Sequence, residues 1–238
     1  MKIRIILPIT GDALIPEVLS EARHWALPTT TVDAVSIHSG STSIESEYDD
    51  VINGPGILAQ VKQAVADKVD GIFVSCFADP AVSAAREIAD IPVVGGFEPA
   101  VLTALGLGER VGFITVLPEV LPMLRGLSRG HGIDGRIAPP RVVNIPVQQL
   151  TDRRKLLSAL LEQAKEAVVT RKEADVIVLG CTGMLGVAKD LQAALLDAAN
   201  VHVPVVDPTA AAITWLESAH RMGLRPSRTT YMPPRNPH

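Results

Sequence analysis

The sequence predicts an α/β protein made of two pseudo-symmetric, doubly wound domains, each with a parallel sheet. Apolar, β-branched runs alternate with helical patterns along the 238 residues, which is typical of successive βαβ units. The composition is 47% hydrophobic but only 3% aromatic, as expected where parallel strands are buried on both faces. The third observation is an internal repeat, in which a strand, a cysteine, a helix, a proline-led strand and a proline-led helix occur twice in the same order.

The first half of the chain is expected to alternate strands and helices from its beginning. The apolar run at 2–7 is too short for a signal peptide and lacks a small-residue cleavage site, so we interpret it as the first strand. A segment rich in Gly, Ser and Thr at 40–43 predicts a polar loop. The remaining elements are a helix at 14–25, a strand at 31–37, a helix at 55–67, a strand at 70–75, a helix at 80–89 and a strand at 92–94.

The second half continues the alternation. Prolines near the first turn open the helices expected at 98–106 and 208–223. Beyond residue 224 the chain is rich in proline, which predicts an extended tail rather than a helix. The elements between those two helices are a strand at 110–115, a helix at 117–129, a strand at 140–145, a helix at 151–172, a strand at 175–179, a helix at 186–199 and a strand at 203–206.

The repeat also predicts the domain organisation. The pair Gly95-Gly96 marks a plausible junction, and the last helix is expected to fold back onto the first domain. We therefore expect an N-terminal domain at 1–97 and 213–238, and a second domain at 98–212. Open α/β folds bind ligands at the carboxyl ends of their strands, so the active site is expected in the cleft between the two domains.

Composition and charge exclude several classes of protein. The net charge is −4 and the basic residues are scattered, so no nucleic-acid surface is predicted. No apolar stretch approaches the roughly 20 residues that span a bilayer, so no membrane association is expected. Two cysteines in a chain of this length do not form a disulfide framework. These observations together favour a cytoplasmic location.

The same survey gives little support for a metal or cofactor site. The six histidines show no metal-binding spacing, and neither cysteine has a second cysteine or a histidine nearby. Gly106 and Gly108 do not follow a strand in a dinucleotide-binding pattern. The serines at 41, 43 and 46 have two readings, an ordinary polar loop or hydrogen bonding to a polar ligand.

The two cysteines carry the chemical prediction. A single free cysteine is more often a small buried hydrophobe than a reactive group. Here, however, Cys76 and Cys181 each follow a strand and precede turn-forming residues in the two copies of the repeat. Backbone N–H groups in those turns would stabilise a thiolate or a developing enolate. Two thiols on opposite faces of one carbon suit stereoinversion, with sulfur atoms roughly 6–9 Å apart.

These motifs resemble the cofactor-independent Asp/Glu racemase superfamily, and within it the hydantoin and allantoin racemase branch. The segments Ser75–Pro80 and Val178–Met184 are similar to the two catalytic motifs of that branch. Ser43-Ile44-Glu45, with Tyr48-Asp49, resembles its substrate loop, and the segments 203–212 and 223–228 resemble its C-terminal pattern.

The resemblance implies 1,1-proton transfer at the stereocentre of a 5-substituted hydantoin or of allantoin, without a cofactor. Cys76 and Cys181 would be the two bases. The partner would be a small-molecule substrate, and we expect a homo-oligomer. The substrate-binding residues would be Pro8, Thr10, Ser43, Ile44, Ser75, Phe77, Ala78, Thr115, Thr182 and Gly183.

Related activities differ from this pattern at particular positions. Glutamate racemases place a histidine two residues beyond the second cysteine, where this chain has Gly183. Arylmalonate decarboxylases keep one of the two cysteines, whereas maleate isomerases keep both. The alternatives that stay open are a racemase or isomerase of aspartate, glutamate or maleate, and a non-catalytic module that binds a small molecule.

Overall fold

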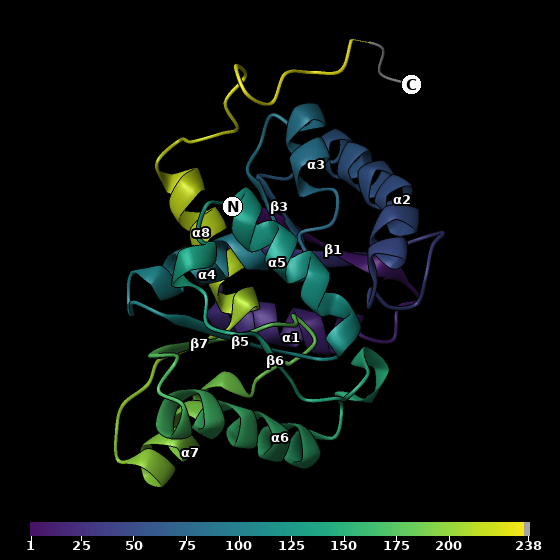
Figure 1. Ribbon diagram of the computed structural model, residues 1–238. Helices are drawn as coiled ribbons and strands as arrows, with labels where there is room; N and C mark the ends of the chain where they lie inside the picture. Colours follow the sequence, from purple (N-terminus) through teal and green to yellow (C-terminus); the bar gives the residue numbers. More distant parts are fainter. Residues whose placement is uncertain (236–238) are drawn as a thin grey trace. The chain divides into compact units, whose positions relative to one another are not determined.

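The computed structural model describes residues 1–235, and the chain in it divides into two compact units. The first unit contains Met1–Ile44, Tyr48–Gly96 and the chain from Thr209 onward. The second contains Phe97–Pro208 together with the short segment Glu45–Glu47. Each unit holds one four-stranded parallel sheet (Figure 1), which confirms the predicted α/β fold.

The first unit is built on a sheet with the strand order β2-β1-β3-β4. Its central strands β1 and β3 run in register from Ile3 opposite Gly71 to Ile6 opposite Val74. The helix α8 belongs to this unit except for its first residue. The elements are β1 (Lys2–Thr10), α1 (Ile15–Trp25), β2 (Thr31–Ile37), α2 (Glu47–Ala66), β3 (Gly71–Val74), α3 (Val82–Ile88), β4 (Val93–Val94) and α8 (Pro208–Arg221).

The second unit repeats this topology with the order β6-β5-β7-β8. In both sheets the first strand along the chain is central and lies between the second and third strands, and the fourth strand lies beyond the third. Its helices and strands are α4 (Phe97–Leu105), β5 (Val111–Thr115), α5 (Leu121–Gly130), β6 (Arg141–Val142), α6 (Arg153–Lys165), β7 (Val176–Leu179), α7 (Ala188–Ala199) and β8 (Val205–Val206). Short helical turns are η1 (Pro118–Val120), η2 (Asp134–Arg136), η3 (Val147–Gln149) and the π-helical η4 (Glu166–Thr170).

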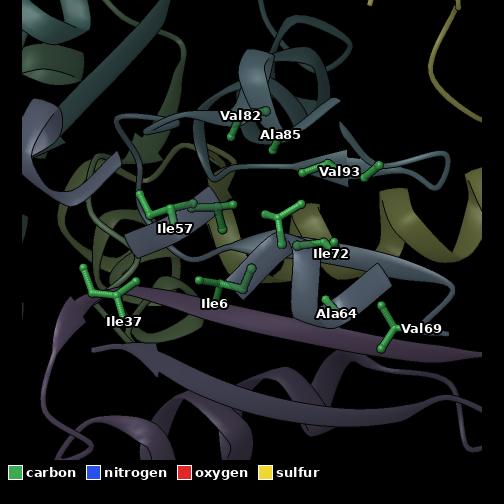
Figure 2. Close-up of a cluster of buried hydrophobic side chains, with 12 residues drawn as sticks. Ile6, Ile37, Ile57, Ala64, Val69, Ile72, Val82, Ala85 and Val93 are labelled. Atoms are coloured by element: carbon green, nitrogen blue, oxygen red, sulfur yellow. The ribbon is translucent and has the colours of Figure 1, made fainter. Parts of the chain in front are cut away.

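Both sheets are buried by helices, as an apolar parallel sheet requires. One face of the first sheet packs against α2 and α3 (Figure 2). In the second unit α4 packs on β5, β7 and β8, with the rings of Phe97 and Phe113 in an edge contact at 5.6 Å. The cluster in Figure 2 comprises Ile6, Ile37, Ile57, Val61, Ala64, Val69, Ile72, Val74, Val82, Ala85, Ala89 and Val93.

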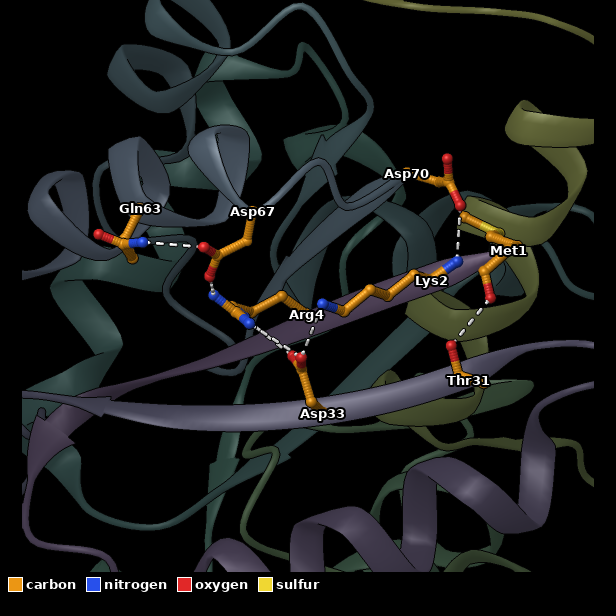
Figure 3. A network of polar contacts seen from close by, with 8 residues as sticks. All are labelled: Met1, Lys2, Arg4, Thr31, Asp33, Gln63, Asp67 and Asp70. Carbon is orange, nitrogen blue, oxygen red and sulfur yellow. Dashed lines mark hydrogen bonds and ion pairs between the residues drawn. The ribbon is translucent and has the colours of Figure 1, made fainter.

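A charged network fastens the first sheet at the amino ends of its strands (Figure 3). The buried Arg4 donates two hydrogen bonds to Asp33, at 2.8 and 2.9 Å, and one to Asp67 at 2.5 Å. Asp67 also accepts a hydrogen bond from Gln63. Hydrogen bonding to Arg4 holds the pKa of both carboxyl groups below their usual value. The guanidinium thus joins β1, β2 and the end of α2, away from the end of β3 that Cys76 follows.

The largest departure from the predicted elements is the start of α2, which begins at Glu47 and not at residue 55. Pro55 lies inside the helix, where it removes one backbone hydrogen bond. Acidic residues in the first turn favour a helix start at Glu47. Gly56 is required by packing, because a methyl group there would lie 2.9 Å from the Ser39 carbonyl oxygen. The proline expected to begin the helix therefore lies within it, and the glycine after it allows close packing.

Other boundaries differ less. β1 continues to Thr10, with an irregular register between Leu7 and Thr10 around Pro8. The strand expected at 140–145 is reduced to Arg141–Val142. The helix expected at 151–172 ends at Lys165 and continues as the π-helical turn η4. Residues 225–235 contain no helix or strand.

Candidate active site

The loop after β3 carries Cys76, two residues beyond the last residue of the strand. The Ser75 N–H donates to the carbonyl oxygen of Ile6 at 2.8 Å, which holds the loop to β1. The Gly96 N–H donates to the carbonyl oxygen of Cys76 at 2.9 Å. The Ala78 N–H points at the sulfur, with N and Sγ 3.5 Å apart. Cys76 is partly exposed, so its thiol is held by backbone groups without being sealed from solvent.

Backbone geometry explains how this loop turns so tightly. Asp79 and Ala81 adopt left-handed conformations, with φ of 51° and 55°. The Asp79 N–H donates to the Cys76 carbonyl oxygen at 3.4 Å. A methyl group at Gly95 would overlap the Asp79 carboxylate. Gly95 is thus required by the loop that positions Cys76, and not by a domain junction alone.

The loop after β7 presents Cys181 in a closely similar way. The Gly180 N–H donates to the Ile114 carbonyl oxygen at 2.8 Å, and the Thr115 hydroxyl donates to the Gly180 carbonyl oxygen at 2.9 Å. The Gly183 N–H points at the sulfur, with N and Sγ 3.4 Å apart. Both thiols therefore face the N–H of the residue two positions further along the chain.

The electrostatics of Cys181 favour the neutral thiol. Burial raises its pKa to about 11, the Gly183 N–H opposes this rise, and the negative charge of Glu45 adds to it. The sequence argument expected backbone N–H groups to stabilise a thiolate. At Cys181 that stabilisation is present, but desolvation outweighs it, so the free protein holds a protonated thiol at neutral pH.

A second cluster lies in the first unit, where the predicted residues Pro8 and Thr10 meet the polar loop. Thr10 donates from its N–H to the carbonyl oxygen of Ser41 at 3.0 Å. Ser41 Oγ donates to the carbonyl oxygen of Ser43 at 2.5 Å. The loop is therefore folded against the end of β1, and the predicted residue Ile44 that follows it is buried.

Asn53 organises this cluster and was missed by the sequence argument. It is fully buried in α2, and its amide nitrogen donates to the Pro8 carbonyl oxygen at 2.7 Å. Its amide oxygen accepts from the Ser41 N–H at 2.7 Å. No motif singles it out, because the residues before the helix expected at 55–67 belong to no predicted element. The available signal was a polar residue on the apolar side of a helix.

The remaining predicted residues divide between the two units. Ser75, Phe77 and Ala78 flank Cys76 in the first unit, and Ser75 and Phe77 are buried. Thr182 and Gly183 follow Cys181 in the second unit, and Thr182 is buried. Thr115 is only 1% exposed and donates its hydroxyl proton to Gly180, which suits a residue that holds the Cys181 loop. Substrate contact by these side chains stays a prediction.

Within residues 1–235, His, Cys, Asp and Glu side chains form no group of three or more that could hold a metal ion. No helix in the same range is both long and apolar enough to cross a membrane.

Two matched cysteine loops on repeated parallel sheets define the class of protein, and the comparisons with known proteins agree. A family model described as Asp/Glu/Hydantoin racemase matches residues 3–216, so the chain belongs to this family. It is an isomerase of the racemase class.

Individual relatives cover nearly the whole chain. A hydantoin racemase from Pseudomonas sp. is 33% identical over 228 residues, which cover 96% of this chain and 89% of the relative. A hydantoin racemase from Rhizobium meliloti is 32% identical over 236 residues, covering 99% and 95%. The solved structure of an allantoin racemase from Klebsiella pneumoniae superposes with a TM-score of 0.91 at 32% identity, covering 100% of this chain and 95% of that one.

Proposed function

We propose that the protein is a cofactor-independent racemase that inverts C5 of a 5-substituted hydantoin or of allantoin, with Cys76 and Cys181 as the two proton-transfer groups. One observation carries this proposal. Each thiol follows the third strand of a sheet of identical topology and faces the N–H two residues on, at 3.5 Å for Cys76 and 3.4 Å for Cys181. Equivalent groups of this kind suit a reaction that treats two mirror-image substrates alike.

The chemistry follows from the properties of a thiol pair. One thiolate takes the proton from C5, and the electron pair of the broken C–H bond passes to the neighbouring carbonyl oxygen as an enolate. The opposite thiol then gives its proton to the other face of C5 and becomes a thiolate. No atom is gained or lost, and the two sulfur atoms exchange protonation states. One carbon must lie within about 3–4 Å of both sulfur atoms, so we predict a separation of roughly 6–9 Å.

The Ala78 and Gly183 N–H groups have a specific task in this cycle. Each lies against a sulfur that carries a negative charge in one half of the cycle. Hydrogen bonds to a charged group are stronger than those to a neutral one. These N–H groups therefore stabilise each thiol in its basic form, in which it can accept the C5 proton.

A cyclic ureide suits this site better than a free amino acid. Gly183 stands two residues beyond Cys181, where glutamate racemases have a histidine as an additional acid–base group. A hydantoin ring stabilises the carbanion as an enolate, so it requires less help from such a group. A side chain at position 183 would be crowded, because a methyl group there would lie 3.1 Å from Leu150 Cδ1 and 3.5 Å from Cys181 Sγ.

The test is a substrate panel followed by chiral chromatography. We expect single enantiomers of 5-substituted hydantoins or of allantoin to be racemised, and L-aspartate, L-glutamate and maleate to be left unchanged. Activity is expected to survive exhaustive treatment with EDTA. Conversion of an acidic substrate alone would overturn the substrate assignment, and loss of activity with EDTA that zinc restores would overturn the cofactor-independent mechanism.

A further inference from the structure

Glu45 has an unusual place in the chain. Its neighbours Ile44 and Tyr48 belong to the first unit, but the segment Glu45–Glu47 belongs to the second. Glu45 Oε1 accepts a hydrogen bond from the Val147 N–H at 2.7 Å. The carboxylate is thus attached to the first residue of η3, a turn that lies more than a hundred residues away in sequence.

The turn that Glu45 holds packs over the Cys181 loop. A methyl group at Gly183 would lie 3.1 Å from Leu150 Cδ1 and 3.9 Å from Val147 Cγ1. Val147 begins η3 and Leu150 follows its end, so side chains from both ends of the turn lie beside Gly183. The N–H of Gly183 is the group that faces the Cys181 sulfur. A chain of direct contacts therefore leads from Glu45 through η3 to the thiol.

Other charged groups near this loop have their own partners. Arg153 donates to the Gly186 carbonyl oxygen and pairs with Asp190. Asp152 accepts from the Lys155 N–H and caps α6. Among the described residues, Glu45 is the charged side chain that shifts the pKa of Cys181, and it acts in the same direction as burial.

We propose that Glu45 is a positioning residue of the Cys181 half-site, which holds η3 over Gly183 and so keeps the Gly183 N–H against the Cys181 sulfur. The inference rests on the proposed function, in which Cys181 is one of the two proton-transfer groups. When Cys181 acts as the acid, its S–H bond breaks, the proton goes to the substrate carbon, and the electron pair stays on sulfur. For the other enantiomer its thiolate takes the C5 proton.

The test measures the Cys181 thiol without any substrate. The chain has two cysteines, so Cys76→Ser leaves Cys181 as the single thiol, and its rate of alkylation by iodoacetamide as a function of pH gives its pKa. Glu45→Gln keeps an oxygen that can accept from Val147 but removes the charge, whereas Glu45→Ala removes both. Glu47→Gln removes an identical charge from the same segment and is the matched control. All four proteins are compared after circular dichroism and thermal unfolding have shown that they are folded.

The expected results separate charge from positioning. Below its pKa a thiol becomes tenfold more ionised for each pH unit by which that pKa falls. With Glu45→Gln we expect a fall of about half a pH unit, and hence alkylation about threefold faster at pH 8. Glu45→Ala should give a smaller acceleration, because η3 no longer holds the Gly183 N–H against the sulfur. Glu47→Gln should alkylate at the rate of the Cys76→Ser parent.

Two results would overturn the inference. If the alkylation profile of Glu45→Gln is unchanged, the charge of Glu45 does not affect the Cys181 thiol. If Glu45→Gln and Glu45→Ala have equal profiles, the hydrogen bond from the Val147 N–H to Glu45 does not position η3. The outcome is independent of the proposed function. A protein that racemises none of the panel can still show the expected profiles, and an active hydantoin racemase can fail to show them.

Discussion

The two cysteine loops share a backbone design and differ in what surrounds them. In both, the thiol follows an inner strand of its sheet, and its sulfur faces the backbone N–H two residues further on. The distance from N to Sγ is 3.5 Å at Cys76 and 3.4 Å at Cys181. The Cys76 loop is closed by the Gly96 N–H and by left-handed residues. The Cys181 loop is closed by Thr115 and covered by the turn that Glu45 holds. The repeated fold therefore places both sulfur atoms, and side chains outside the repeat differ around them.

This difference bears on the proposed mechanism, in which one thiol and one thiolate are needed at a time. Burial and the charge of Glu45 raise the pKa of Cys181 and so favour its protonated form. The contact of Glu45 with η3 thus distinguishes the Cys181 loop within a fold that is otherwise repeated.

The largest expected effect comes from removing either thiol. Cys76→Ser and Cys181→Ser should each lower the rate of full racemisation by at least about a hundredfold, because a serine hydroxyl is a much weaker base at neutral pH and general acid–base groups contribute on this scale. Chiral chromatography from each pure enantiomer measures the rate. A wild-type rate in one variant would show that its cysteine is not a proton-transfer group, and the two loops would then not be equivalent.

The glycines of the loops should be next in effect. A methyl group at Gly180 would lie 2.8 Å from Thr115 Cβ and 3.0 Å from the Ile114 carbonyl oxygen, and one at Gly95 would overlap Asp79. Gly95→Ala and Gly180→Ala should therefore each reduce the free energy of unfolding by about 1–3 kcal/mol, as overpacking typically does, and should reduce kcat. Urea unfolding and initial rates measure both effects.

Gly126→Ala is the matched control for these two substitutions. A methyl group there meets nothing within 4 Å in α5, so stability should be unchanged or raised by up to about 1 kcal/mol. If Gly95→Ala and Gly180→Ala unfold at the same urea concentration as Gly126→Ala, the loops are more adaptable than their contacts indicate.

A pH-dependent effect on stability should follow from the raised pKa of Cys181. The pKa of Cys181 is raised from 9.0 to about 11 in the folded protein, so the unfolded chain loses this proton first as the pH rises. The contribution to stability is fully present below pH 9 and is lost between pH 9 and about pH 11, up to about 3 kcal/mol. Urea unfolding at pH 8 and pH 10 should show a smaller loss for Cys181→Ser than for the parent. Equal losses in the two proteins would contradict the raised pKa.

A smaller effect is expected in the loop of the first unit, at Asn53. Asn53→Asp keeps an oxygen for the Ser41 N–H but loses the donor to the Pro8 carbonyl oxygen, so it should cost about 1–3 kcal/mol. Since the cluster lies apart from both thiols in sequence, the pH profile of Cys181 alkylation should not move. A destabilisation below about 0.5 kcal/mol would show that the buried amide is not what holds the loop.

Much of this architecture is predictable from sequence because strands and helix ends depend on residues that are close together along the chain. Alternating apolar runs predict the strands, and prolines and glycines predict the ends of several helices. The repeat predicts that Cys76 and Cys181 follow equivalent strands. The resemblance to racemases, carried by Ser75–Pro80 and Val178–Met184, agrees with the family of the chain.

What sequence reasoning missed depends on contacts between distant segments. Pro55 is expected from the sequence to begin a helix, and the packing of Gly56 against Ser39 inside a longer helix is not visible along the chain. Asn53 has no motif, and its role appears only when Pro8 and Ser41 are brought to it. Glu45 was noted as part of a loop pattern, but its bond to Val147 spans 102 residues. Burial raises the pKa of Cys181, and the charge of this distant residue adds to that rise.

The central claim is that the two thiols work on opposite faces of one carbon, and hydrogen–deuterium exchange of the C5 proton tests it most directly. Proton NMR in deuterated buffer follows this exchange for each pure enantiomer with Cys76→Ser and Cys181→Ser, against an enzyme-free blank. The remaining thiol in each variant should exchange the proton of one enantiomer, and the preferred enantiomer should be opposite in the two variants. Exchange of the same enantiomer by both variants would contradict the opposite-face mechanism, and a general folding defect cannot produce the opposite preference.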